Sequence, residues 1–224
     1  VISKAMVRVE LDADKEADLA TARQAAANWT KSVDESLAEM QQEHVDAYYM
    51  MATNNVSLVR SEEMYGAFSR AKAAGKVSHF GISSHENAEN VLIAAAGTGW
   101  YDLAQIAITP AGWYDWINKD ILAGTGDMVS LRPVLDAARE AGIGLIGMKA
   151  GRHLAGRRFI GWGSPDAYDQ HYAPAVAQSG LTAFQKSYAF VLAHGLDAVN
   201  ADMQVWQHLR ENLVAATEGQ RFFV

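Results

Sequence analysis

The feature that most constrains the fold is a repeated alternation of apolar, strand-like segments with segments of helical spacing. The predicted strands are 1–9, 45–52, 77–84, 102–109, 142–150 and 196–203. The predicted helices follow them at about 17–42, 62–74, 88–96, 129–141, 182–194 and 206–217. Consecutive strand–helix units with mostly apolar strands predict a parallel sheet covered by helices.

Two architectures satisfy this pattern: a doubly wound open sheet and a (β/α)8 barrel. A doubly wound dinucleotide-binding sheet is expected to carry a GxGxxG turn after a strand, and the sequence contains none. Polar residues instead occur at or after several strands, namely Lys4, Ser83, Ser84, His85, Gln105, Lys149 and Arg152, with Gly151 between the last two. Because the βα loops of a barrel converge on one face, this distribution favours the barrel, although six units are not eight.

Composition and charge exclude several classes of function. The net charge of −7 is spread along 224 residues, which gives no basic surface for nucleic acid or an acidic membrane. No apolar run approaches the roughly 20 residues that span a bilayer. The absence of cysteine excludes disulfides and thiolate metal sites, and the seven histidines lack metal-ligand spacing, so no metal site is expected. We expect a cytoplasmic location; any targeting segment would lie upstream of Val1.

Three stretches of the sequence read "SVDESLAEMQQEHVDAYYM", "EEMYGAFSRAKAAGKVSHFGISSH" and "AAREAGIGLIGMKAG". In their order and spacing they resemble the aldo/keto reductase family, and they are most similar to the branch that often carries an iron–sulfur module. The resemblance implies a (β/α)8 barrel that reduces carbonyls with NADPH, as a single domain over residues 1–224. Aligned in this way, Val1 falls at the third barrel strand, so the first two βα units are missing from the chain. Either the chain is a piece of a longer sequence or the barrel is truly shortened; the first is favoured, because an open barrel exposes two sheet edges.

The resemblance also assigns catalytic positions. The family uses an Asp and a Tyr from the second strand region, a Lys ending the third strand and a His ending the fourth. Lys4 matches the Lys, which lowers the pKa of the proton-donating Tyr, and the Asp and Tyr would lie before Val1. Met51 stands at the His position, where a thioether cannot donate a hydrogen bond to a carbonyl oxygen. Thr53 and Asn54 are the nearby polar alternatives.

Two adjacent tyrosines, Tyr48 and Tyr49, lie in the same predicted strand as Met51. One of them could point into the barrel. A tyrosine in such a strand is more often part of the core, with its hydroxyl satisfied.

On the cofactor side, Ser83, Ser84 and Gln105 occupy the positions that hold the nicotinamide carboxamide in the family, with Ser84 replacing an Asn. Hydroxyl and amide groups both donate and accept, as an amide ligand requires. The alternative is that the two serines cap the following helix. The presence of Gln105 on the next strand favours the ligand-binding interpretation.

Further cofactor positions follow from the same resemblance. Met148 stands where the family often has an aromatic ring that stacks on nicotinamide. The positions for the pyrophosphate are Lys149, Gly151, Arg152 and Arg157, and those for adenine are Glu211 and Asn212. The alternative for the arginine-containing segment is a solvated surface loop. Asp202 replaces a family Gly near the phosphates, where a carboxylate is repulsive. The resemblance implies NADP as cofactor, with NAD as the alternative, and Asp202 weakens the expected preference for NADP.

Two hypotheses of function remain. The first is a nicotinamide-dependent oxidoreductase that transfers hydride to or from a small carbonyl or alcohol substrate. The second is a catalytically impaired barrel that serves as a nucleotide-sensing or protein-interaction subunit, which Met51 and Asp202 favour. A barrel hydrolase or isomerase would need paired carboxylates at strand ends, and the sequence lacks them. The substrate and the oligomeric state do not follow from the sequence.

Overall fold

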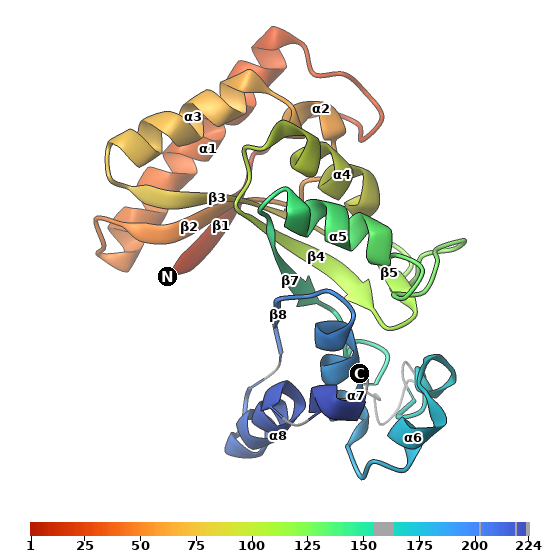
Figure 1. Cartoon of the computed structure of the whole chain (residues 1–224). Coiled ribbons are helices and arrows are strands. Elements are labelled where there is room, and N and C mark those ends of the chain that lie inside the picture. The colour runs from red at the N-terminus through yellow and green to blue at the C-terminus, as the bar shows by residue number, and fades with distance from the viewer. Residues whose placement is uncertain (155–163, 202, 218, 223–224) are drawn as a thin grey trace. The chain divides into compact units, whose positions relative to one another are not determined.

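The computed structural model describes residues 1–154, 164–201, 203–217 and 219–222. The chain divides into two compact units (Figure 1). Unit 1 consists of Val1–Gln105 and Ala137–Gly144, and unit 2 of Ile106–Asp136 and Leu145–Val224. The prediction of a single domain over residues 1–224 stays a prediction.

Unit 1 is built on a sheet with the strand order β1-β2-β3-β4. Its strands are β1 (Ile2–Met6), β2 (Val45–Met51), β3 (Val77–Ser84) and the beginning of β4 (Leu103–Thr109). Its helices between strands are α1 (Leu19–Met40), α2 (Val56–Val59), α3 (Glu62–Ala73) and α4 (Ala88–Thr98). The pairing of β1 with β2 and of β2 with β3 is parallel, as predicted.

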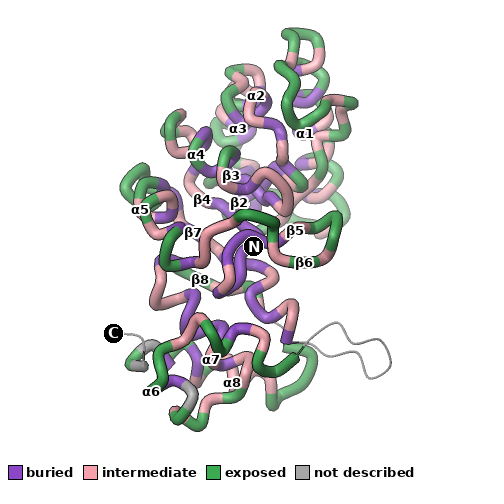
Figure 2. Tube along the Cα trace, turned by 90° about the vertical axis from the view of Figure 1, so that its right-hand side faces the viewer, coloured by how far each residue is buried: buried purple, intermediate pink, exposed green. Residues whose placement is uncertain are grey.

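The core of unit 1 lies between helices α1 and α3 and one face of this sheet. Trp29 of α1 is fully buried, and its ring makes edge contacts with Tyr48 and Phe80 at centroid distances of 5.6 and 5.5 Å. Phe68 of α3 stacks on Phe80 at 4.8 Å. Figure 1 shows both helices on the same side of β1–β3, and Figure 2 shows buried residues concentrated in β2 and β3. Since side chains alternate along a strand, the residues between these core positions point to the other face.

Unit 2 contains the remainder of β4 and most of the later elements. Its further strands are β5 (Gly112–Asp115), β6 (Asp120–Ile121), β7 (Gly144–Met148, beginning in unit 1) and β8 (Ala198–Val199). Its helices are α5 (Arg132–Glu140, ending in unit 1), η1 (Asp169–His171), α6 (Pro174–Ala177), α7 (Ala183–Ala193), α8 (Trp206–Thr217) and η2 (Gly219–Phe222). β7 pairs with β4 and, in parallel, with β8.

The structure differs from the predicted elements in several places, which include the short helices α2, η1, α6 and η2, none of them predicted. The segment after β4 forms the short antiparallel strands β5 and β6, because backbone pairs such as Ile108 with Trp113 and Tyr114 with Ile121 satisfy its polar groups. The sixth predicted strand, 196–203, is reduced to Ala198–Val199. No helix within the described ranges is both long and apolar enough to cross a lipid bilayer.

Candidate functional site

Three of the predicted site residues meet in unit 1. The Lys4 ammonium donates to Gln105 Oε1 at 2.7 Å, and the Ser83 hydroxyl donates to the same oxygen at 3.2 Å. Ser83 is fully buried and Gln105 is 7% exposed. The strands β1, β3 and β4 thus bring together groups that are 101 and 22 residues apart in sequence.

The strand register explains why these groups share a face. Lys4 is opposite Tyr49 of β2, which is opposite Gly81 of β3, so that Lys4, Tyr49 and Ser83 all project away from the helices α1 and α3. Gly81 provides the room, since a Cβ at this position would lie only 2.1 Å from Cδ1 of the Tyr49 ring. Partial burial lowers the pKa of Lys4.

Ser84 does not join this cluster. It follows Ser83 directly in the strand, so its side chain leaves on the opposite face, and its hydroxyl donates to the backbone oxygen of Glu86 at 2.6 Å. The capping alternative does not hold either, because the residue that caps α4 is Asn87, without a side-chain capping bond, and Ser84 donates to a carbonyl where a cap would accept from a helix N–H. Of the two serines, Ser83 alone contacts Gln105 among the described residues.

Met51 lies beside the cluster, opposite Met6 of β1 and Ser83 of β3. The position is therefore on the same face as Lys4, and it presents a thioether. The polar alternative Thr53 uses its hydroxyl to donate to Met50 O at 2.8 Å. The Thr53 hydroxyl is therefore engaged with the backbone and does not take the place of a histidine donor.

The two neighbouring tyrosines have different environments. Tyr48 faces α1, where its hydroxyl lies 2.8 Å from Ser36 Oγ and donates to Ser32 O at 2.9 Å. The Tyr49 hydroxyl is buried without a hydrogen-bond partner among the described residues, and burial raises its pKa to about 12. Sequence reasoning left open which tyrosine points inward, and the register assigns Tyr49 to the face of Lys4.

In unit 2, the predicted cofactor loop begins at the end of β7. Met148 is buried against Ala107 and Tyr114. Lys149 adopts a left-handed backbone conformation with φ of 73°, and its ammonium lies 4.8 Å from the centre of the Trp116 ring. The Arg152 side chain makes no ion pair or hydrogen bond within the described residues. Arg157 and Asp202 lie outside the described residues.

Glu211 and Asn212 of α8 line a small hollow of about 60 Å³ together with Phe184, Tyr188 and His208. Its aromatic walls also meet the predicted loop, since a Cβ on Gly151 would lie 2.7 Å from the Phe184 ring. The Glu211 carboxylate accepts from Gln207 Nε2 at 2.8 Å. Unit 2 therefore brings Gly151, Glu211 and Asn212 to the same pair of aromatic side chains. The hollow is far smaller than a pocket for a whole ligand, which spans about 300–1,000 Å³.

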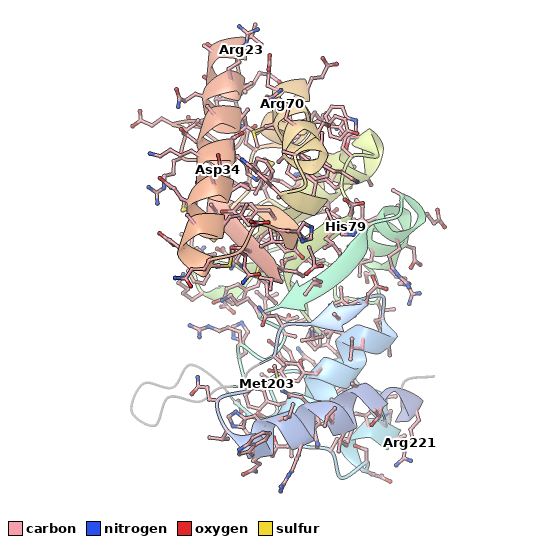
Figure 3. All side chains as sticks on the ribbon, turned by 90° about the vertical axis from the view of Figure 1, so that its left-hand side faces the viewer. Arg23, Asp34, Arg70, His79, Met203 and Arg221 are labelled. Atoms are coloured by element: carbon pink, nitrogen blue, oxygen red, sulfur yellow. The ribbon has the colours of Figure 1, made fainter. Side chains whose placement is uncertain are left out.

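A larger and open groove lies elsewhere, along α1 and α3. Figure 3 shows Arg23 and Asp34 on α1 and Arg70 on α3, and these residues line the groove. Its walls carry both signs of charge, and Arg23 pairs with Glu63 at 3.2 Å. Among the described residues, no group of three or more histidine, aspartate or glutamate side chains is arranged to hold a metal ion.

Comparisons with solved structures bear on the fold of the chain. The chain is similar in structure to the aldo-keto reductase AKR11C1 from Bacillus halodurans in its holo form, with a TM-score of 0.58 and 18% identity over 86% of this chain and 62% of that one. It is also similar to the thermostable aldo-keto reductase Tm1743 in complex with the inhibitor epalrestat, with a TM-score of 0.59 and 17% identity over 85% of this chain and 61% of that one. A putative 2,5-diketo-D-gluconic acid reductase B gives a TM-score of 0.53 and 22% identity over 89% of this chain and 60% of that one.

The chain therefore spans about three fifths of the length of each of these proteins. The likeness confirms the predicted α/β fold, of the (β/α)8-barrel type. A search of curated protein sequences gave no match. The model of the Aldo/keto reductase family matches residues 3–150, a range that contains most of β1, all of β2 to β7 and the Lys4–Ser83–Gln105 cluster. On this match, the chain belongs to the aldo/keto reductase family.

Proposed function

We propose that this protein is an NAD(P)H-dependent oxidoreductase that acts on a small carbonyl or alcohol substrate. The observation that carries the proposal is the convergence of Lys4, Ser83 and Gln105 on the face of the unit 1 sheet that α1 and α3 leave free. The nicotinamide cofactor, when bound, supplies or accepts the hydride. The residues of the chain hold and orient it and manage the accompanying proton.

The chemistry of the cluster fits a nicotinamide carboxamide. The Gln105 Nε2 group has no partner among the described residues, so it can donate to a ligand oxygen. The Ser83 hydroxyl, which donates to Gln105, keeps lone pairs that can accept. An amide donor that no described group of the protein uses is available to a ligand, which supports a binding role.

Unit 2 supplies the other cofactor residues of the proposal. Gly151 and Arg152 would contact the pyrophosphate, where backbone approach and a guanidinium are favourable. Glu211 and Asn212 would contact adenine beside Phe184 and Tyr188. Lys149, Met148 and Arg157 belong to the same proposal on the family resemblance alone. NADP is proposed as the cofactor, with NAD as the alternative.

Lys4 is proposed to support the transfer of the proton that accompanies the hydride. An ammonium next to a phenol lowers the phenol pKa, so that a tyrosine can release its proton to the carbonyl oxygen as hydride arrives. The proposal places that tyrosine in sequence upstream of Val1. Tyr49 is unsuited to this role, because burial raises its pKa to about 12.

A second candidate function is supported by Met51. Its place beside Ser83 leaves the substrate carbonyl without the donor that a histidine would give. A chain that binds the nucleotide but turns over no carbonyl would match this candidate, a nucleotide-sensing or interaction subunit.

The test is a titration of the protein with NADPH and with NADH, followed by tryptophan fluorescence, with turnover of an aldehyde panel measured in parallel. We expect saturable binding at micromolar to millimolar cofactor and at least tenfold weaker binding for Gln105→Leu. The exposed residue Gln42 offers the matched control, Gln42→Leu, which should bind normally. Binding without turnover would favour the second candidate. If neither cofactor binds at millimolar concentration, the proposed function is wrong.

A further inference from the structure

The side chain of Asn55 holds the segment that connects β1 with α1, residues 7–18. Asn55 follows the end of β2 and is 2% exposed. Its Nδ2 group donates to Asp12 O at 2.7 Å and to Lys15 O at 2.8 Å, and its Oδ1 accepts from the Leu58 N–H at 2.9 Å. Both N–H donors and the oxygen of the amide are therefore used. All these partners are backbone groups, so the bonds fix the path of the β1–α1 connection itself.

Two further contacts hold the start and the end of this connection. Asn28 of α1 donates from Nδ2 to Val7 O at 2.9 Å and to Arg8 O at 3.0 Å. The Ala17 N–H donates to Ser57 Oγ at 2.7 Å. Arg8 has a φ of 48°, a left-handed conformation that is uncommon for a residue other than glycine and persists where surrounding contacts hold it. The β1–α1 connection is thus fastened at its start, middle and end.

The chain beyond β2 is also tied to the end of β3. The Thr53 N–H donates to Ser83 O at 3.1 Å, and Asn87 Nδ2 donates to Asn54 O at 2.8 Å. Since Thr53, Asn54 and Asn55 are consecutive, one short stretch joins the segments that leave β1, β2 and β3. Ligands of parallel α/β sheets and barrels bind at the carboxyl ends of the strands, which is where this stretch lies.

We infer that Asn55 is a positioning residue, which keeps the β1–α1 connection as a fixed wall of the cofactor site before any ligand binds. The inference rests on the proposed function, since the connection follows the strand that carries Lys4. Asn55 acts here through the backbone of Asp12 and Lys15 and not by touching the ligand. A wall that is already ordered spares the ligand the entropic cost of ordering it, so its release should weaken binding.

The first test is hydrogen exchange, followed by mass spectrometry, on the full chain with and without saturating NADPH. Peptides that contain the amides of Lys15 and Ala17 should be protected in the free protein, because these amides donate to Asp12 O and to Ser57 Oγ. Their exchange should change less than twofold when NADPH is added. A tenfold slowing on addition of NADPH would mean that the connection orders only around the ligand, and it would overturn the inference.

The second test uses Asn55→Asp, which keeps the oxygen that caps α2 and removes both N–H donors. Exchange in the β1–α1 connection should become at least tenfold faster in the free variant, and NADPH should now slow it, since the released segment is ordered by the ligand. The Kd for NADPH should rise at least tenfold. Gln42→Glu makes the same amide-to-acid change at an exposed position and should alter none of these values.

A merely structural role for Asn55 would lower stability without making the exchange of the connection respond to NADPH. Unchanged exchange, or an unchanged Kd despite faster exchange, overturns the inference. Circular dichroism checks folding, and should Asn55→Asp not fold, Asn55→Ser supplies an uncharged cap without the two donors and decides by the same measurements. If the wild-type chain binds neither NADPH nor NADH, the proposed function fails and the inference falls with it, whereas failure of the inference alone leaves cofactor binding intact.

Discussion

At the scale of single residues, strand alternation separates neighbours that look equivalent in sequence. Ser83 contacts Gln105, whereas Ser84 bonds locally to the backbone of Glu86. Tyr48 packs under α1 with its hydroxyl satisfied, whereas Tyr49 lies on the face of Lys4. In each pair, one residue lies on the face that carries Lys4 and the other faces the core or a turn, because adjacent side chains leave a strand on opposite faces.

Met51 is the residue whose replacement is most informative. Met51→His would restore a donor beside Ser83, on the face that carries Lys4. One well-placed donor to a developing oxyanion changes kcat by about 10²-fold or more, so we expect kcat/KM for aldehydes to rise by about 10²-fold. Steady-state kinetics over an aldehyde panel measure this.

The control is Met40→His at the end of α1, which makes the same chemical change away from the sheet face and should leave kcat/KM unchanged. An unchanged rate in Met51→His, with cofactor binding intact, would show that position 51 does not correspond to the family histidine.

At the scale of elements, α1 is held on the sheet by one large side chain. Trp29 contacts Tyr48 of β2 and Phe80 of β3, and the helix contributes further buried residues along the same stripe, including Val33 and Leu37. The helix begins at Asp18, whose carboxylate accepts from the Thr21 N–H, and it ends at Gln41 in a left-handed conformation. Packing against β2 and β3 therefore fixes the helix, and the sheet face opposite to it stays free for Lys4 and Ser83.

Replacing this side chain tests the packing. Trp29→Ala should destabilise unit 1 by about 3–5 kcal/mol, the usual cost of removing a buried aromatic side chain. Urea unfolding followed by circular dichroism measures the change. Leu19→Ala, at an exposed position on the same helix, should cost well under half as much. A loss below about 1 kcal/mol for Trp29→Ala would mean that α1 is not anchored through this residue.

At the scale of the whole molecule, the division into two units does not follow chain order. The segment Ala137–Gly144 belongs to unit 1 although unit 2 residues lie before and after it. Its last residue donates from Gly144 N to Asp102 O at 2.9 Å, and Asp102 also accepts from the Phe80 N–H at 2.9 Å. These bonds tie the segment to β3 and the start of β4.

Hydrogen exchange followed by mass spectrometry tests this assignment. The amides of Ala137–Gly144 should show protection that rises and falls with that of β2 and β3 as urea is added, since residues of one cooperative unit open together. Peptides from α7 and α8 serve as the internal comparison. If Ala137–Gly144 instead exchanges in step with α7 and α8, the division of the chain is different from the one described.

Much of the fold was predictable from local patterns. The apolar run 77–84 coincides with β3, and the helical spacing of 206–217 coincides with α8, because burial of one face imposes a period that the sequence must carry. The short pair β5 and β6 was missed, since its stability depends on pairing with β4 and not on its own composition. The candidate residues themselves came from the family resemblance, and the α/β fold it implied is confirmed.

The sequence by itself determined the alternation of strands and helices, the residue types at the strand ends and the absence of cysteine chemistry. The tertiary structure decided which of those residues meet: Lys4 with Gln105 and Ser83, but not Ser84. The physical reason is that strand register, and with it the sheet face on which each side chain lies, is set by non-local contacts. Both depend on how β1, β3 and β4 pair through the backbone, and a shift of one residue would turn every side chain of a strand to the other face.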